Sequence, residues 1–224
     1  MKRDFMEAAV TQLKLDNLGI EPYHRMVGIL GGTFDPVHEG HIDIAEKVFL
    51  EFELSCVYFI VDGDPPHKSN LTPAKDRLEM VRLATSKHDF LVPSDMEISR
   101  PGKTYTVDTL RLLKEKFPQD EFYYIIGADT LFEIETWKDI EEVCRLTDFI
   151  CIGRSGISEK DSIRKSRELS DSIGARILHS EQSGFDISST DIRMLAEKGE
   201  DISGLVPDPV RDYITKNGLY KRQK

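Results

Sequence analysis

The stretch GGTFDPVHEGH, residues 31–41, follows the apolar run MVGIL (26–30) and leads into a segment with helical periodicity. Gly31 and Gly32 permit positive φ angles and let a ligand approach the backbone closely, while Pro36 sets a stiff turn. The stretch therefore has the character of a ligand-binding loop between a buried strand and a helix.

Beyond this loop, short runs rich in β-branched and aromatic residues alternate with amphipathic segments. The expected strands are MVGIL (26–30), CVYFIV (56–61), FLV (90–92), FYYIIG (122–127), DFICIG (148–153) and ARILHS (175–180). The expected helices span 41–53, 73–87, 107–117, 158–172, 190–198 and 207–216. This alternation predicts a Rossmann-like α/β fold, a mostly parallel sheet with helices on both faces. Ligands of such sheets bind beyond the carboxyl ends of the strands, where the first strand meets residues 31–41.

Length and composition limit the classes of function. A chain of 224 residues suits a single domain, which we expect over residues 26–224, with residues 1–25 as an N-terminal extension of unknown role. The formal net charge of −10 argues against a nucleic-acid-binding surface. No apolar run has the length of a membrane span, and Asp4 and Glu7 argue against a signal peptide, so we expect a cytoplasmic protein without a membrane partner. Three cysteines without a CxxC pair indicate neither a disulfide framework nor a zinc site.

Two histidines stand in the first turn of the first expected helix. His38 and His41 are three residues apart, beside the unpaired amides of the helix N-terminus, which carries about half a positive elementary charge. Imidazoles and amides together suit a phosphate, and especially the charge that builds up when phosphorus is attacked. Two other interpretations stay open: Asp35, His38 and His41 as metal ligands, or two solvated histidines in a helix cap.

A second anion-binding device is expected in FDISSTDIRMLAEKG, residues 185–199. Ser188 or Ser189 can cap the helix, Thr190 and the free amides can face a ligand, and Arg193 follows about one turn later. Taken alone, such a stretch is more often only a good N-cap. Paired with the first device, it predicts two helix N-termini that hold one polyphosphate.

The two stretches together resemble the HxGH nucleotidyltransferase superfamily, and further segments resemble its bacterial-type nicotinate mononucleotide adenylyltransferase branch. These segments are DPPHK (64–68), RLEMVRLA (77–84), RPGKTYTVDTL (100–110), GADTLFEIETW (127–137) and VPDPVRDYITKNGLY (206–220). The resemblance covers about residues 26–220 and implies a nucleotidyltransferase domain. It further implies an enzyme of NAD biosynthesis that joins ATP and nicotinate mononucleotide into nicotinic acid adenine dinucleotide, with release of pyrophosphate and normally with Mg²⁺.

The resemblance also implies roles for individual residues. The catalytic residues would be His38, His41 and Arg193. ATP would be bound by Gly32, Thr33, Phe34, His38, His41, Gly127, Asp129, Ser188, Ser189, Thr190 and Arg193. The mononucleotide would be bound by Lys68, Tyr105, Thr106, Asp129 and Trp137, with the Trp137 indole stacked on the pyridine ring. No residue is assigned as a metal ligand, and Asp62 and Asp64 either face away from the phosphates or help hold magnesium through water.

Alternative functions remain open at this point. Another HxGH transferase, either a pantetheine-phosphate adenylyltransferase or a cytidylyltransferase, shares the first motif but is disfavoured by ISSTDIR (187–193) and Trp137. A non-catalytic nucleotide-binding sensor is disfavoured by the intact His38, His41 and Arg193. The sequence leaves open a homo-oligomer and the preference for nicotinate over nicotinamide mononucleotide.

Overall fold

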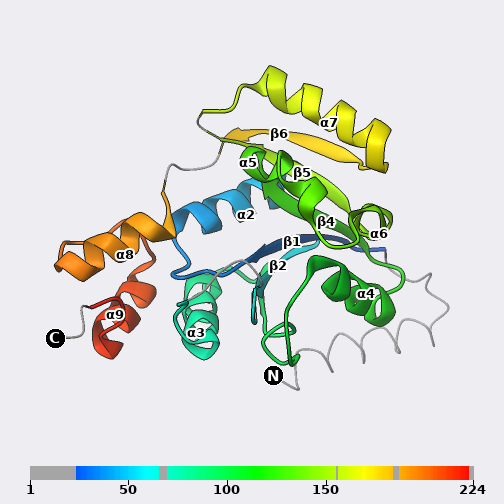
Figure 1. Ribbon diagram of the computed structural model, residues 1–224. Helices are drawn as coiled ribbons and strands as arrows, with labels where there is room; N and C mark the ends of the chain where they lie inside the picture. The colour runs from blue at the N-terminus through cyan, green and yellow to red at the C-terminus, as the bar shows by residue number, and fades with distance from the viewer. Residues whose placement is uncertain (1–23, 66–69, 155, 184–186, 222–224) are drawn as a thin grey trace.

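The computed structural model describes residues 24–65, 70–154, 156–183 and 187–221 (Figure 1). Six strands form one parallel sheet in the order β3-β2-β1-β4-β5-β6. The strands are β1 Met26–Gly32, β2 Cys56–Val61, β3 Leu91–Ser94, β4 Glu121–Gly127, β5 Asp148–Gly153 and β6 Ile177–Ser183. The helices are α2 Glu39–Glu51, α3 Ala74–Thr85, α4 Thr106–Lys116, α5 Ala128–Leu131, η1 Ile134–Thr136, α6 Ile140–Leu146, α7 Glu159–Ile173, α8 Ser189–Lys198 and α9 Asp208–Asn217. This is the predicted Rossmann-like architecture.

The strand order reverses next to β1. The chain first adds β2 and β3 on one side of β1, then crosses through α4 to place β4, β5 and β6 on the other side. In open parallel sheets the crevice at such a reversal, beyond the carboxyl ends of the strands, is the place where ligands bind. Here that crevice lies between the ends of β1 and β4.

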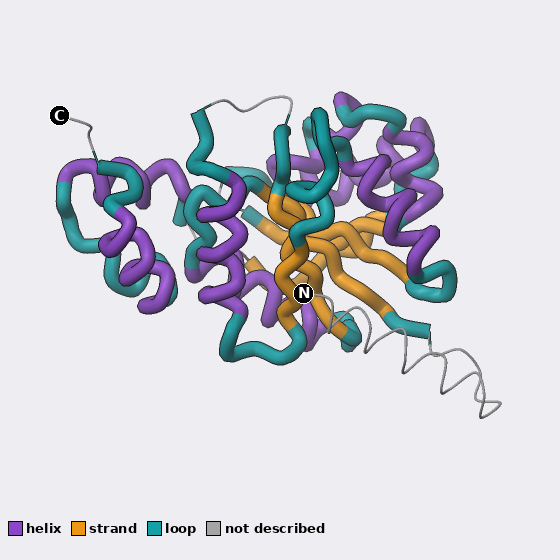
Figure 2. Tube along the Cα trace, turned by 90° about the horizontal axis from the view of Figure 1, so that it is seen from below, coloured by secondary structure: helices purple, strands orange, loops and turns teal. Residues whose placement is uncertain are grey.

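The sheet separates two hydrophobic cores. Side chains alternate along each strand, so that Val57 and Phe59 of β2 enter one core while Tyr58 and Ile60 enter the other. Helices α2, α3, α8 and α9 cover the first core, and α4, α5, α6 and α7 cover the second. Figure 2 shows the strands between two groups of helices. Both faces are therefore dry, which explains why the strand sequences are apolar runs rather than alternating patterns.

The predicted element ends are off by a few residues, and three short elements were not predicted. Helix α2 begins at Glu39 rather than His41, and α8 at Ser189 rather than Thr190. Elements α5, η1 and α6 have four, three and seven residues, too few to show a helical period in sequence. Of the predicted extension 1–25, only residues 24 and 25 are described, and Arg25 Nε donates a hydrogen bond to Asp120 Oδ1 at 3.1 Å. Among the described ranges, no helix combines the length and the apolar character of a membrane span.

Candidate active site

A cavity of about 890 Å³ opens at the crevice where the strand order reverses. Its walls come from the ends of β1, β4 and β5 and from the starts of α2, α4 and α8. Every described residue predicted for the site lines it: Gly32, Thr33, Phe34, His38, His41, Tyr105, Thr106, Gly127, Asp129, Trp137, Ser188, Ser189, Thr190 and Arg193. Lys68 lies outside the described residues. The fold thus brings together groups that are up to about 160 positions apart in sequence, while their individual roles stay predictions.

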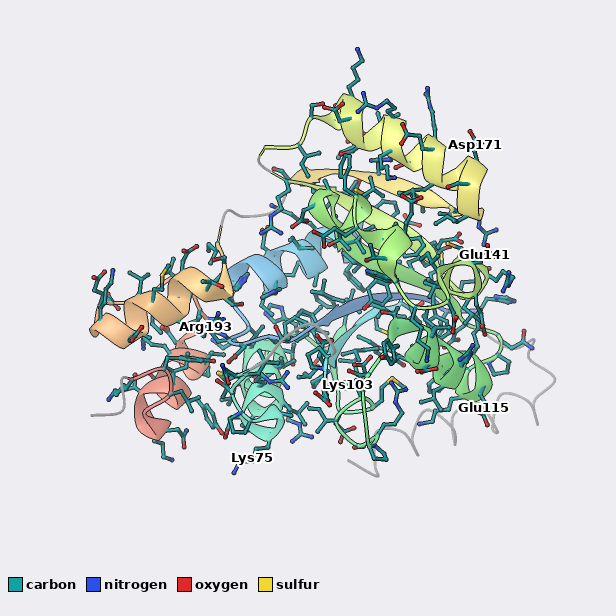
Figure 3. All side chains as sticks on the ribbon, in the orientation of Figure 1. Lys75, Lys103, Glu115, Glu141, Asp171 and Arg193 are labelled. Carbon is teal, nitrogen blue, oxygen red and sulfur yellow. The ribbon has the colours of Figure 1, made fainter. Side chains whose placement is uncertain are left out.

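The N-termini of α2 and α8 meet at one side of the cavity (Figure 1). The Ser189 hydroxyl donates a hydrogen bond to the Pro36 carbonyl at 2.9 Å. Arg193, labelled in Figure 3, reaches back from α8 and donates from Nη1 to the Asp35 carbonyl at 2.7 Å. Its Nη2 also donates to Thr190 Oγ1 at 3.1 Å. These bonds hold the start of α8 against the loop 31–38, so two helix dipoles add their positive ends at one place.

The two serines of the second device have different functions in the fold. Ser188 is the N-cap of α8, and its Oγ accepts a hydrogen bond from the Asp191 amide at 3.1 Å. Ser189 instead makes the link to Pro36. Either serine was a possible cap from the sequence, and in the structure Ser188 caps the helix.

The two histidine rings lie against each other. Their centroids are 3.6 Å apart with an interplanar angle of 28°, and the Phe34 ring packs edge-on against His41 at 5.0 Å. The His38 amide donates to His41 Nδ1 at 3.2 Å. Because Nδ1 of His41 accepts, the neutral His41 ring carries its proton on Nε2 and is a donor at that atom. His38 is the N-cap of α2 and is only 6% exposed.

His38 is held in its neutral form. Burial, followed by the positive charge of Arg154, lowers the pKa of His38 from 6.5 to about 4. At a pH between these two values, the His38 ring is mostly protonated in the unfolded chain and mostly neutral in the folded chain. His38 therefore costs stability as the pH falls from about 6.5 toward 4, and no such cost exists above that range.

This leads to a titration experiment on His38. In ligand-free protein followed by NMR, we expect the ring of His38 to remain neutral from pH 8 down to about 5, because its pKa is about 4. Adding a non-hydrolysable ATP analogue is expected to raise the pKa of His38, because a bound polyanion favours the charged ring. Protein unfolded in urea serves as the control. A ligand-free midpoint near 6.5 would contradict the burial of this ring.

Asp35 is not placed to bind a metal together with the histidines. Its carboxylate is 2% exposed, and Oδ2 accepts from the Thr72 amide at 3.1 Å while Oδ1 accepts from the Tyr220 hydroxyl at 2.7 Å. In the part of the chain that the structure describes, no three His, Cys, Asp or Glu side chains form a group that could hold a metal ion. The structure thus pairs Asp35 with Thr72 and Tyr220 rather than with the two histidines.

The opposite wall of the cavity carries an acid and an aromatic side chain. Asp129 Oδ2 accepts from Arg154 Nη1 at 2.7 Å, and a Cβ at Gly127 would lie 2.4 Å from Asp129 Oδ1. Only glycine at 127 therefore leaves the carboxylate in its position. Trp137 packs edge-on against Tyr124, with ring centroids 5.5 Å apart. Trp137 is partly buried and lines the cavity.

The chain is similar to a known family of proteins. The model of the cytidylyltransferase-like family matches residues 29–195. A protein of Clostridium botulinum named probable nicotinate-nucleotide adenylyltransferase is 43% identical over 196 residues, which span 86% of this chain and 98% of the relative. A protein of the same name from Desulfitobacterium hafniense is 42% identical, over 88% of this chain and 96% of that protein. The chain is a nicotinate-nucleotide adenylyltransferase family member.

Solved structures agree with the fold of this adenylyltransferase. The nicotinic acid mononucleotide adenylyltransferase of Plasmodium falciparum, complexed with NaAD, aligns with a TM-score of 0.73 at 24% identity and covers 88% of this chain and 98% of its own. The same protein complexed with APC aligns with a TM-score of 0.71 at 23% identity, over the same shares of both chains. At this identity the likeness concerns the fold alone.

Several cavity residues of the adenylyltransferase were not predicted as site residues. Tyr124 and Glu97 line the cavity, and a Cβ at Gly31 would lie 2.1 Å from the Tyr124 hydroxyl, which explains this glycine. Burial raises the pKa of Tyr124, so the hydroxyl stays a neutral donor. The sequence did not decide whether Asp62 and Asp64 face the phosphates. Asp62 lines the cavity, whereas Asp64 pairs with Lys103 at the surface at 2.8 Å.

Arg154 also stands at the cavity wall, where its Nη1 donates to Asp129 Oδ2. The alternation of FYYIIG (122–127) places successive tyrosines on opposite faces of the sheet, but it does not show which of them lines a cavity.

Proposed function

We propose that the chain transfers the adenylyl group of ATP to nicotinate mononucleotide, producing nicotinic acid adenine dinucleotide and pyrophosphate in NAD biosynthesis. Family membership supports this activity, and the observation that carries it in the structure is the junction of α2 and α8. Two positively ended helices, two imidazoles and a guanidinium line the same part of one cavity. This arrangement suits the triphosphate of ATP.

The reaction needs positioning and charge stabilisation more than it needs an acid or a base. A 5'-phosphate oxygen of the mononucleotide attacks the α-phosphorus of ATP, a P–O bond forms, and the bond to the β-phosphate oxygen breaks as pyrophosphate departs with its electron pair. The attacking phosphate is already an anion, so no side-chain base has to remove a proton. The charge on the phosphorus oxygens increases in the transition state, and fixed donors lower its energy.

The donors at this position would have separate tasks. His41, with its proton on Nε2, would donate to the α-phosphate in the transition state. Neutral His38 beside it would donate one further hydrogen bond and would gain a proton more readily once the phosphates are bound. Arg193 and the amides at the start of α8 would hold the departing pyrophosphate.

The mononucleotide would occupy the wall formed by α4, β4 and η1. Tyr105 is the N-cap of α4 and Thr106 its first residue, so free amides at the start of this helix line the cavity near Trp137. Amides at a helix N-terminus favour a carboxylate over a neutral amide, which fits nicotinate better than nicotinamide. Asp129 would accept a hydrogen bond from a ribose hydroxyl.

We propose that Mg²⁺ enters with ATP rather than in a site built by the protein. Mg²⁺ keeps several waters and is commonly bound through substrate phosphates plus one or two carboxylates. Asp62 and Glu97 are cavity-lining carboxylates, which fits this mode of binding, with Asp62 as the residue for a water-mediated contact. The ion would neutralise phosphate charge that the histidines and Arg193 do not reach.

The activity is tested by incubating the purified chain with ATP, Mg²⁺ and either nicotinate or nicotinamide mononucleotide. We expect pyrophosphate release and a dinucleotide product, with higher kcat/KM for the nicotinate substrate. Phosphopantetheine and CTP-dependent acceptors serve as controls for the other HxGH transferases. ATP binding without release in any mixture would indicate a sensor instead of an enzyme.

A separate prediction concerns Trp137. The Trp137→Ala variant is expected to raise KM for nicotinate mononucleotide about 10-fold or more, since stacking of one base on an aromatic ring contributes about 1–3 kcal/mol. ATP binding should change little, because the indole packs against Tyr124 and Phe149 rather than against the residues predicted to bind the triphosphate. Isothermal titration with each ligand separates the two effects. Loss of ATP affinity instead would place the pyridine ring elsewhere.

A further inference from the structure

Arg77 of α3 has an unusual environment for a charged residue. It is 1% exposed and is the largest of the fully buried side chains among the described residues. Burial lowers the pKa of Arg77, while the nearby Asp35 and Asp62 act in the opposite direction. An apolar side chain of similar volume would avoid this cost. The retained guanidinium therefore needs an explanation beyond filling space.

The guanidinium donates hydrogen bonds to three backbone carbonyls in two loops, the loop after β1 and the connection between β2 and α3. Nη1 donates to the Thr33 carbonyl at 2.7 Å, Nε to the Thr72 carbonyl at 2.9 Å, and Nη2 to the Gly63 carbonyl at a longer 3.4 Å. Thr33 lines the cavity itself, and the other two carbonyls belong to residues that follow the cavity-lining Asp62 and Leu71. One buried cation thus connects two loops at the edge of the active site, and holds one of them at two points.

The bond to Thr33 determines how one peptide group is oriented. Among the described residues the cis peptide bond is Asp35–Pro36, so the peptide between Thr33 and Phe34 is trans, and its C=O and N–H point in opposite directions. Arg77 holds the Thr33 carbonyl, so the Phe34 N–H points away from the guanidinium, and Phe34 itself lines the cavity. No backbone hydrogen bond found outside the helices and strands of the described residues uses this amide. The Phe34 ring packs against His41, so Phe34 belongs to the same part of the cavity lining as the histidine pair.

We infer that Arg77 is a positioning residue, which fixes the Phe34 N–H as a donor to a phosphate group of the nucleotide. This inference rests on the proposed adenylyl transfer. Arg77 would support that reaction without touching the substrate. Three carbonyls in different directions require the planar fork of a guanidinium, and the ammonium of lysine cannot hold all three in the same way. If Arg77 were only a stabilising crosslink, its replacement would lower the resistance to unfolding without changing the geometry of the Phe34 donor.

The first test compares Arg77→Lys with Arg82→Lys. Arg82 lies on the same helix, its side chain is 41% exposed, and it pairs with Glu79 at 3.8 Å on the surface. We expect Arg77→Lys to lower kcat at least about 10-fold, less than the loss of a direct transition-state donor. KM for the mononucleotide should change less than kcat, because none of the three carbonyls that Arg77 holds belongs to a residue predicted to bind the mononucleotide, and Arg82→Lys should match wild type. Full kcat in a folded Arg77→Lys protein would overturn the inference.

The second test follows the Phe34 amide directly and does not depend on turnover. In protein labelled with ¹⁵N-phenylalanine, adding pyrophosphate should shift the Phe34 resonance in wild type and in Arg82→Lys. In Arg77→Lys this shift should be lost, while Phe59 and Phe149 in the cores keep their positions. A wild-type Phe34 resonance that ignores pyrophosphate would overturn the inference even if Arg77→Lys does not fold. Wild-type protein that shows the shift but has no turnover with either mononucleotide would reject the proposed function alone.

Discussion

Replacing His41 with alanine is expected to lower kcat by at least about 100-fold while the protein remains folded, the usual loss when one transition-state donor is removed. His41 Nδ1 accepts from the His38 amide, which directs the Nε2 proton to the ligand side of the ring. Alanine removes that donor and leaves the remaining amides of the α2 N-terminus in place. KM for ATP should therefore change much less than kcat, because the lost bond is strongest when the phosphorus is under attack.

The matched control is His88→Ala. His88 lies outside the cavity and pairs with Glu46 at 2.9 Å, so its removal should leave kcat within about 2-fold of wild type, as for most surface substitutions. Steady-state kinetics, together with the midpoint of thermal unfolding for both variants, separate catalysis from folding. A His41→Ala protein with turnover near that of wild type would refute the assigned role of this histidine.

Arg193→Ala is the second variant with a large expected effect, a loss in kcat/KM of about 100-fold on the scale of a charged transition-state donor. The guanidinium bonds to the Asp35 carbonyl and to Thr190, so its removal takes away a positive charge and also one link between α8 and the loop 31–38. Arg193→Lys restores the charge without the two-directional geometry and should fall between wild type and alanine. Inhibition by added pyrophosphate should weaken in the same order, because that product is the proposed partner of Arg193.

Lys198→Ala provides the comparison on the same helix. Lys198 is exposed in the last turn of α8, far from the cavity-lining first turn, so its loss should change neither kcat/KM nor pyrophosphate inhibition. If pyrophosphate inhibits Arg193→Ala as strongly as wild type, the guanidinium does not hold the departing group.

The predictable part of the fold is the part with long periodic segments. Six strands and six long helices were expected, because burial on both faces of a sheet imposes apolar runs and because helices above about ten residues show their period. The sequence did not predict the helices α5, η1 and α6 between β4 and β5, because none of them is longer than about two turns. Their positions depend on packing against the second core rather than on local pattern.

The site was predictable where chemistry is concentrated in a short stretch beside a strand end. His38, His41 and Arg193 stand in such stretches, and the fold brings them to one cavity. Arg77 and Tyr124 had no comparable signal, because an arginine in a helix and a tyrosine in a strand are ordinary in sequence. Their importance arises from three-dimensional neighbours, the loop carbonyls in one case and Gly31 in the other. Register and helix rotation decide such contacts, and spacing alone does not reveal them.

The hydrogen bond between the Tyr220 hydroxyl and the Asp35 carboxylate joins residues that are 185 positions apart. During translation the ribosome makes the loop 31–38 well before Tyr220, because 185 positions separate the two partners of this bond. A nascent chain can therefore form the first strands before this tether exists, and the loop is anchored on that side only once Tyr220 has been made. A chain interrupted before Tyr220 would lack one support of the reaction centre.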